Sequence, residues 1–285
     1  MAEDQNLGGG IQNVCGGLQN LHSHTTYCDG VLSAEEMVRA AIDKGFDSIG
    51  FSEHSYVRFE KTYSMSLEQT QAYSLEVNSL KKKYVNEIEI FLGIEQDCFS
   101  ESPTDGFDYI IGVAHYIKLD GEYETVDAGS KNQKWIAERH FGGDYIKMAE
   151  AYFETVAGIT EKMEADVIGH FDLVAKYNSS GSLFDEKHPK YVSSAIDAMT
   201  ELLKKCRLFE INTGAMYRLG KSEPYPSVFL LRELHKRGGE VILSSDSHDA
   251  ASLGYKFFDM IELLKTCGFK YLKRLTGEGF IDIAL

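Results

Sequence analysis

Seven short apolar segments, each ending in polar side chains, constrain the fold of this chain more than any other feature. They span residues 17–22, 47–54, 87–97, 108–115, 166–172, 208–214 and 240–248. Nearly continuous apolar strands that alternate with amphipathic helical stretches are typical of a parallel sheet covered by helices. Seven such units favour a closed or nearly closed α/β barrel of the TIM-like type, with its active site at the C-terminal ends of the strands.

The alternative fold is a doubly wound open sheet. That fold usually carries a glycine-rich phosphate loop after its first strand. The chain contains neither GxGxxG nor the motifs GxxxxGKS and GxxxxGKT, which favours the barrel.

Helix signals lie between the apolar segments. Ser33 and Glu36 have the spacing of a capping box, and the helix they begin is predicted to stop at Gly45. A long helix is predicted to open on Ser66 and to run to residue 84. Further helices are predicted over residues 144–159 and from starts near Pro189, Ser227 and Asp249.

Residues 116–143 are mostly polar and include four glycines, at positions 121, 129, 142 and 143. This composition predicts a long loop. Loops of this length often cover a functional site.

The length of the chain is compatible with one domain. It has 285 residues, of which 43% are apolar, and α/β barrels of about 250 residues fold as single units. We expect residues 17–285 to form one barrel domain. The Gly-rich stretch 1–16 is expected to be a flexible leader.

The charge balance is acidic, with 29 Lys and Arg against 44 Asp and Glu, which gives a formal net charge of −15. Such a field repels an extended phosphate backbone, so extended nucleic-acid binding is disfavoured. A small phosphate ester is still compatible, because bound cations reverse the potential locally.

The five cysteines are scattered and form no CxxC pair. This pattern indicates neither a disulfide framework nor a thiolate zinc site, and it fits a reducing cytoplasm. No run of about 18 apolar residues predicts a membrane span.

Polar side chains stand at or just after the C-terminal end of every apolar segment: His22 and His24, His54, Glu95, His115, His170, Glu210 with Asn212, and Asp246 with His248. In a barrel these ends form one face, so residues that are distant in sequence converge there. Members of the two pairs spaced two residues apart, His22 with His24 and Asp246 with His248, point to the same side of an extended strand.

Taken singly, each of these histidines is more simply an ordinary hydrogen-bonded residue. Their convergence favours a metal cluster, because many buried imidazoles and carboxylates without a cation would leave polar groups unsatisfied. The candidate ligands are six histidines and three carboxylates: His22, His24, His54, His115, His170, His248, Asp29, Glu95 and Asp246. Asp29 lies in a turn before Gly30, where a purely conformational role is the alternative.

Nine N/O ligands exceed the needs of one ion, so two to three divalent transition-metal ions are predicted. Zn, Mn, Fe, Ni and Co are all compatible with a ligand set that contains no thiolate.

Seven motifs in the chain resemble those of the polymerase and histidinol phosphatase (PHP) superfamily, especially its bacterial histidinol-phosphatase branch. They are LHSHTTYCDG, GFSEHS, LGIEQD, VAHY, IGHFDLV, FEINTGAMYR and SSDSH, in family order from residue 21 to residue 248. The resemblance implies a distorted (βα)7 barrel with a trinuclear metal site.

The resemblance also implies how the ligands are shared among the metals. The first metal would be held by His22, His24, Glu95 and Asp246; the second by Glu95, His115 and His170; the third by Asp29, His54 and His248. Some family members place His at the position of Asp29. Glu95, Asp246 and His248 are the residues we expect to take part in catalysis.

The activity implied is the hydrolysis of L-histidinol phosphate to L-histidinol and phosphate, a step of histidine biosynthesis, in the cytoplasm. A metal-bridging hydroxide would serve as the nucleophile. Arg218 and Lys176 follow strand ends and are candidates for binding the phosphate, with a solvated surface charge as the alternative for each. The expected partner is therefore a small phosphorylated substrate, and no membrane association is expected.

Other functions compete with this hypothesis. A PHP phosphoesterase for nucleotides or oligonucleotides would need a basic groove, which an acidic chain does not indicate. Metal-dependent amidohydrolases also begin with HxH on a barrel strand, but they typically carry a carboxylated Lys where this chain has His115. A metal-binding protein without enzymatic activity is the remaining class.

A few further polar residues follow the strand motifs. Glu210 and Asn212 share one strand face and could orient a ligand or the substrate's ammonium group, or simply pack. Cys28 and Cys98 are expected to be spectators beside ligands. Five tyrosines could line a pocket or only pack: Tyr27, Tyr56, Tyr116, Tyr177 and Tyr217.

Overall fold

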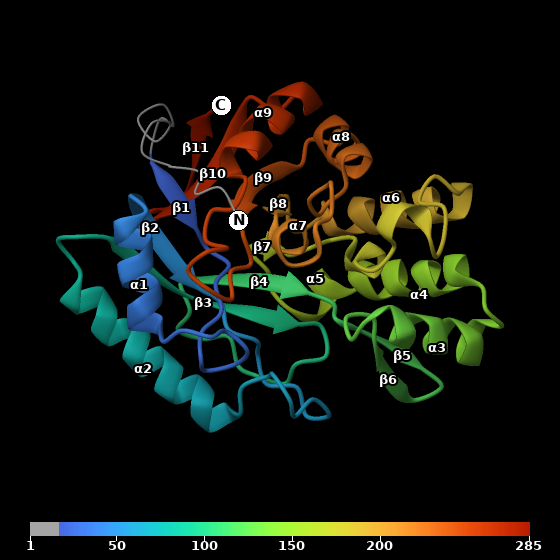
Figure 1. Cartoon of the computed structure of the whole chain (residues 1–285), viewed down its shortest axis with the longest axis horizontal. Coiled ribbons are helices and arrows are strands. Elements are labelled where there is room, and N and C mark those ends of the chain that lie inside the picture. The colour runs from blue at the N-terminus through green and yellow to red at the C-terminus, as the bar shows by residue number, and fades with distance from the viewer. Residues whose placement is uncertain (1–16) are drawn as a thin grey trace.

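The computed structural model describes residues 17–285, and the predicted leader, residues 1–16, lies outside the described residues. Seven parallel strands form one sheet in the order β1-β2-β3-β4-β7-β8-β9 (Figure 1). Their bounds are β1 Leu18–Asn20, β2 Phe46–Phe51, β3 Glu89–Asp97, β4 Tyr109–Val113, β7 Val167–Ile168, β8 Leu208–Asn212 and β9 Glu240–Ser244. The predicted α/β class and the seven strands are confirmed.

The two edge strands of the sheet approach each other at their C-terminal ends. Ser23 and Ser247 form a parallel bridge. The backbone N–H of His24 donates to Ser247 O at 2.8 Å, and Ser247 N–H donates to His22 O at 3.1 Å. These bonds nearly close the barrel, so the doubly wound alternative is wrong.

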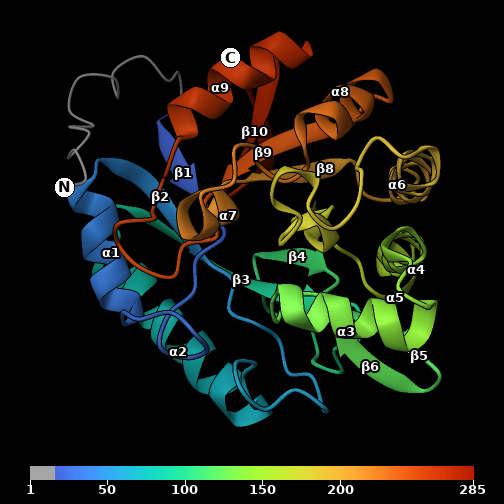
Figure 2. The ribbon, with the colours of Figure 1, turned by 45° about the vertical axis from the view of Figure 1, so that its right-hand side comes forward.

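Helices surround the barrel, with α1 and α2 on one side and α4 and α6 on the other (Figures 1 and 2). Their bounds are α1 Ala34–Asp43, α2 Leu67–Lys83, α4 Tyr145–Ala157, α5 Ile159–Lys162, α6 Pro189–Leu202, α7 Gly214–Leu219, α8 Val228–Lys236 and α9 Phe257–Cys267, with 3₁₀ turns η3 Leu173–Ala175 and η4 Ser179–Gly181. The capping box of Ser33 with Glu36 is present, as is one of Ser66 with Gln69. These caps satisfy backbone N–H groups at the two helix starts. Because a cap depends only on residues close in sequence, both starts could be predicted from the sequence.

The helix predicted to start near Asp249 begins eight residues later, at Phe257. Asp249 instead accepts a bond from Ser252 N–H at 2.7 Å, which closes a turn. Lys256 adopts a left-handed conformation with φ 57°, so a continuous helix cannot form before it.

The long loop predicted over residues 116–143 is wrong. The segment contains a hairpin, β5 Tyr116–Leu119 with β6 Glu122–Thr125, followed by helix α3 Ser130–Phe141. Asp120 and Gly121 both have positive φ, the geometry of a two-residue hairpin turn. Gly142 forms the left-handed C-cap of α3. These glycines therefore mark turns and caps within regular structure.

A C-terminal hairpin, β10 Tyr271–Thr276 with β11 Gly279–Ala284, was not predicted. Leu275 is buried in the same apolar cluster as Leu208, the first residue of β8. The side chain of Gln19 bonds both the N–H and the C=O of Leu275, at 2.8 and 2.9 Å. The hairpin thus packs at the end of the barrel where the strands begin and leaves the other end for polar groups.

Tyr109 occupies the barrel interior and is fully buried. Its hydroxyl donates to Phe51 O at 3.0 Å, and its ring lies beside Gly93 of β3. A Cβ added at Gly93 would come within 2.1 Å of Tyr109 Cζ. Only glycine therefore fits at this position.

We expect Gly93→Ala to lower the free energy of unfolding by about 1–3 kcal/mol, because the tightly packed ring and β3 must separate. Urea denaturation measures the change. The control is Gly277→Ala, where no atom lies within 4 Å of the added Cβ and the change should stay within about 0.5 kcal/mol. Equal stability of the two variants would contradict the packing of Tyr109 on β3.

Candidate metal centre

The C-terminal end of the barrel brings together all nine predicted ligands. His22 and His24 follow β1, His54 follows β2, Glu95 lies in β3, His115 follows β4, His170 follows β7, Asp246 and His248 follow β9, and Asp29 lies in the turn after His24. The parallel strands place their ends on one face, which is why residues from across the chain meet.

The carboxylate of Glu95 is the centre of this cluster. It is 1% exposed, and five of the six histidines have a ring nitrogen within 4 Å of it. Its Oε1 lies 2.8 Å from His170 Nε2, 3.4 Å from His22 Nε2 and 3.5 Å from His115 Nε2. Its Oε2 lies 2.5 Å from His54 Nδ1 and 3.7 Å from His24 Nε2. One buried carboxylate therefore faces imidazoles from both halves of the barrel.

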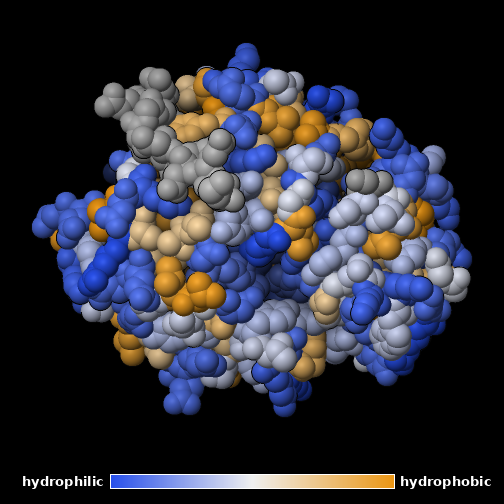
Figure 3. Space-filling model, in the orientation of Figure 1, coloured by the Kyte–Doolittle hydropathy of each residue, from blue (hydrophilic) through white to orange (hydrophobic). Residues whose placement is uncertain are grey.

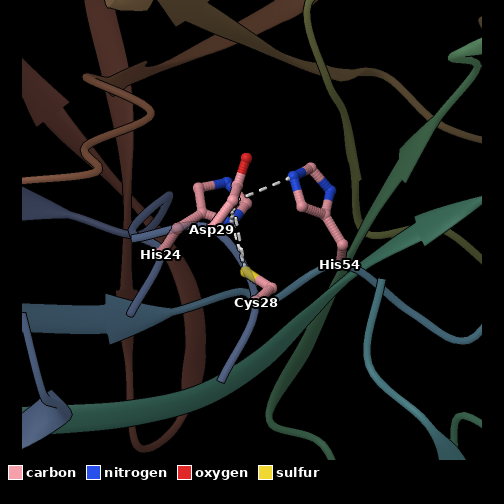
Figure 4. A group of neighbouring side chains, drawn as sticks. All are labelled: His24, Cys28, Asp29 and His54. Atoms are coloured by element: carbon pink, nitrogen blue, oxygen red, sulfur yellow. Dashed lines mark hydrogen bonds and ion pairs between the residues drawn. The ribbon is translucent and has the colours of Figure 1, made fainter. Parts of the chain in front are cut away.

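Two further carboxylates complete the cluster. Asp246 Oδ1 lies 3.3 Å from His24 Nε2, 3.6 Å from His248 Nδ1 and 3.8 Å from His22 Nε2. Asp29 lies 3.3 Å from His248 Nε2 and 3.5 Å from His54 Nε2. Figure 4 shows Asp29 between the rings of His24 and His54, with Cys28 beside it. The turn aspartate therefore reaches the cluster.

The arrangement fits metal ions. His22 Nε2 and His24 Nε2 are buried and make no hydrogen bond, whereas buried polar atoms normally have partners. Ligand atoms of His22, His24 and Asp246 lie within 4.8 Å of one another, as do those of His54, Glu95 and His115. Imidazole and carboxylate ligands at these spacings suit divalent transition ions, which would satisfy the unpartnered atoms.

The protonation of the cluster reflects its crowding. Burial opposes a charged His22, but the carboxylates of Glu210, Asp246 and Glu95 raise its pKa well above the usual value. His24 is different: burial and the neighbouring His248 and His54 lower its pKa to about 3. The carboxylates thus attract positive charge, and bound metal ions would supply it in place of protons.

A cavity of about 420 Å³ opens onto this cluster, lined by seven of the nine predicted ligands together with Arg218 and Lys176. The cavity is large enough for a small organic ligand. In the orientation of Figure 1, a recess near the centre of the molecule is bordered mainly by hydrophilic residues (Figure 3). The two residues predicted to bind phosphate therefore share a cavity with the metal ligands.

Both cationic residues of the cavity are already paired with carboxylates. Arg218 Nη2 lies 2.9 Å from Asp246 Oδ2, and its Nη1 donates to Asp246 O at 2.6 Å and lies 3.0 Å from His248 Nδ1. Lys176 Nζ lies 2.5 Å from Asp127 Oδ1. Arg218 thus contacts two predicted metal ligands, and neither cation is a simple solvated surface charge.

Comparison with known proteins identifies the family. The family model for the PHP domain matches residues 20–214, which is more than half of the chain. The chain belongs to the PHP domain family.

Relatives of this PHP protein match over most of their own length. The "Probable histidinol-phosphatase" of Deinococcus radiodurans is 29% identical over 266 residues, which cover 88% of this chain and 94% of the relative. The histidinol-phosphatase of Bacillus subtilis is 21% identical over 265 residues, covering 85% and 97%.

A solved structure has the same fold. It is histidinol phosphate phosphatase from Lactococcus lactis in complex with zinc, L-histidinol and phosphate, with a TM-score of 0.69 and 22% identity. The match covers 92% of this chain and 98% of that protein.

Within residues 17–285 of the PHP protein, no helix is long and apolar enough to cross a bilayer.

Buried carboxylates orient several histidines of the PHP cluster. Glu210 Oε2 lies 2.8 Å from His22 Nδ1, and its Oε1 accepts bonds from the backbone N–H of His170 and from Asn212 Nδ2. Asp97 Oδ2 lies 3.2 Å from His115 Nδ1. A carboxylate at one ring nitrogen directs the other toward the cluster.

Sequence reasoning assigned no role to Asp97, although a signal was present. Asp97 follows Glu95 by two residues on one strand, which places both on the same face. The same two-residue spacing predicts the shared faces of His22 with His24 and of Asp246 with His248.

Cys28 lies beside two predicted ligands, as expected. Its Sγ lies 3.3 Å from His24 Nδ1 and 3.3 Å from Asp29 Oδ1, and it donates to Glu53 Oε2 at 2.5 Å. Glu53 is fully buried and also accepts a bond from Thr25 Oγ1. This network anchors the turn that carries Asp29.

We expect the purified wild-type protein to contain two or three divalent transition ions per chain, and Glu95→Gln to contain fewer. The substitution removes the charge that faces five imidazoles, so kcat should fall by more than about a hundredfold. This loss is larger than that typical of substituting a residue that only hydrogen-bonds a metal ligand. Elemental analysis and kinetics measure both effects. Glu101→Gln, at an exposed ion pair with Arg58, is the control; wild-type metal content and turnover in Glu95→Gln would contradict the assignment.

Proposed function

We propose that this PHP protein is a metal-dependent phosphomonoester hydrolase that converts L-histidinol phosphate and water to L-histidinol and phosphate. The observation that carries this proposal is the nine-residue cluster, of which seven members line a cavity that is also lined by Arg218 and Lys176. The substrate is supported by the names of relatives that match this chain over most of their length. The reaction is a step of histidine biosynthesis.

The proposed ligands divide into three overlapping sets. They are His22, His24, Glu95 and Asp246; Glu95, His115 and His170; and Asp29, His54 and His248. When bound, divalent ions would lower the pKa of water and neutralise charge on the phosphate. Two to three ions, of Zn, Mn, Fe or a similar metal, match the number of ligands.

Arg218 is suited to hold a phosphate while remaining anchored. A guanidinium has five N–H donors, and its contacts with Asp246 and His248 use three of them. The others can donate to phosphate oxygens at the same time. The ion pair with Asp246 fixes the guanidinium before the substrate arrives, which reduces the entropy lost on binding.

Lys176 would contribute a second positive charge. Its ammonium group is held by Asp127, which lies between β6 and α3 and lines the same cavity. The hydroxyl of the neighbouring Tyr177 donates to Asp127 O at 2.6 Å. These contacts hold the segment between β6 and α3 against the residues that follow η3.

The acidic surroundings of the cavity favour a small ester over a nucleic acid. The chain has a net charge of −15, and the two cavity cations described above each face a carboxylate. A long phosphate backbone would meet repulsion outside the cavity. The cytoplasmic location stays a prediction based on cysteine usage.

The direct test is hydrolysis by the metal-loaded protein of a panel of phosphate esters. The panel contains L-histidinol phosphate, p-nitrophenyl phosphate, a nucleoside monophosphate and a short oligonucleotide. We expect kcat/KM to be highest for L-histidinol phosphate, and chelation followed by metal addition to abolish and restore turnover. Preference for the oligonucleotide would favour the nucleotide phosphoesterase, and absence of turnover with every ester would refute the proposal.

Arg218→Ala should lower kcat/KM about tenfold to a hundredfold, because charge-assisted hydrogen bonds are worth about 1.5–3 kcal/mol. Inhibition by inorganic phosphate should weaken in parallel, and Arg218→Lys should restore only part of the loss. Metal analysis of each variant separates phosphate binding from the contact with Asp246. Unchanged inhibition by phosphate in Arg218→Ala would show that the guanidinium does not bind the ester.

A further inference from the structure

Five carboxylates line the active-site cavity, and one of them has no charged partner. Asp29, Glu95 and Asp246 belong to the metal cluster, and Asp127 pairs with Lys176. The fifth, Glu60, forms no ion pair with any residue of the described chain, 17–285. Its negative charge therefore faces the cavity without compensation.

The carboxylate of Glu60 is fixed in place by neutral donors. Its Oε1 accepts bonds from Lys61 N–H at 2.8 Å and from Thr62 N–H at 2.6 Å, as well as from the Thr62 hydroxyl. Its Oε2 accepts one bond, from the hydroxyl of Tyr116 at 2.8 Å. A carboxylate oxygen can accept more than one hydrogen bond, so Oε2 retains capacity for a ligand.

These bonds also keep Glu60 ionised. Partial burial acts against the charged form, but the donors from Thr62, Tyr116 and the Lys61 backbone hold the pKa of Glu60 below its usual value. The group therefore carries its charge at neutral pH.

Two tyrosines connect Glu60 to the metal cluster. The hydroxyls of Tyr116 and Tyr63 lie 2.5 Å apart. The ring of Tyr63 packs edge-on against His54, with the centroids 4.7 Å apart, and Tyr63 also lines the cavity. Glu60 is thus linked through these tyrosines to His54, and it lines the same cavity as Arg218 and Lys176. The organic part of a small ester whose phosphate lies at those two cations would extend within this cavity.

We propose that Glu60 selects phosphate esters whose organic part carries a positive charge, by pairing with that charge. The inference rests on the proposed function, because L-histidinol phosphate bears an ammonium group and an imidazole beyond its phosphate. The arrangement divides recognition between two ends: cations receive the phosphate, and Glu60 receives the cationic group. A neutral ester gains nothing from the second contact.

The test compares Glu60→Gln with wild type on a cationic and a neutral ester. Gln keeps an oxygen that can accept the bonds from Lys61 and Thr62 but removes the charge. We expect kcat/KM for L-histidinol phosphate to fall about tenfold, the size of a charge-assisted hydrogen bond in a partly exposed site. Turnover of p-nitrophenyl phosphate should stay within about twofold.

Binding of products provides a second readout. Competitive inhibition by L-histidinol should weaken in Glu60→Gln by a factor similar to the loss in kcat/KM, whereas inhibition by inorganic phosphate should not change. Glu101→Gln is the matched control, since it removes one negative charge from an exposed ion pair with Arg58 and does not line the cavity. It should leave both esters and both inhibitors unaffected.

Tyr116→Phe provides a second test of the same contact if Glu60→Gln does not fold. It removes only the hydroxyl that orients Oε2, so the same selective loss should appear with smaller size. Equal losses on both esters, or no loss on either, in the variant that folds would overturn the proposal.

Failure of the proposed function would look different from failure of this inference. If wild type does not hydrolyse L-histidinol phosphate, the same comparison of variants is made with O-phosphoethanolamine against p-nitrophenyl phosphate. A selective loss on the cationic ester would then uphold the role of Glu60 while the proposed substrate is rejected.

Discussion

The site depends on one interaction, the contact of the buried Glu95 carboxylate with five imidazoles that follow four different strands. A buried carboxylate without counter-charge is costly, because it loses the solvation that water provides. Here Oε1 and Oε2 each face several ring nitrogens, at 2.5 to 3.7 Å. Those nitrogens and the bound cations they imply are what make burial of the carboxylate tolerable. Every element that carries one of these histidines must therefore end at the same depth in the barrel.

Closure of the barrel sets that depth. The bridge between Ser23 and Ser247 joins the first strand to the last. It places His22 and His24 next to Asp246 and His248, although more than 220 residues separate them in sequence. At the opposite end, Leu275 and the Gln19 bonds to the C-terminal hairpin pack the strand starts with apolar and neutral groups. The end of the barrel where the strands begin is thus filled by packed apolar and neutral groups, and the opposite end carries the charged residues, as in TIM-like barrels generally.

Charges around the cavity are arranged in advance of any ligand. Arg218 is held by Asp246 and Lys176 by Asp127, so the two cations that would meet a phosphate are oriented by carboxylates. Glu60 is instead held by hydroxyl and amide donors, which leaves its charge available. Preorganised groups of this kind lose little entropy when a substrate binds. The cavity therefore presents both signs of charge within one small volume.

Much of this could be predicted from the sequence alone. Apolar runs and polar strand ends predicted the barrel class and the nine residues that converge, because strand periodicity and parallel topology follow from local pattern. Caps such as Ser33 with Glu36 were equally local. The hairpin over residues 116–125, the helix α3 and the C-terminal hairpin were missed, because the glycine signals of turns and caps also fit loops.

Only the tertiary structure decided which polar residues act together. The position of Asp97 on the same strand face as Glu95 could have been predicted from their two-residue spacing. The pairing of Arg218 with Asp246, the contact of Cys28 with Glu53 and the uncompensated charge of Glu60 depend on loop paths that bring together segments from different parts of the chain. The sequence determined which chemistry the strand ends carry, since residue type and period are local properties. Distances and charge pairing were decided by the closed barrel, because they are set by contacts between distant segments.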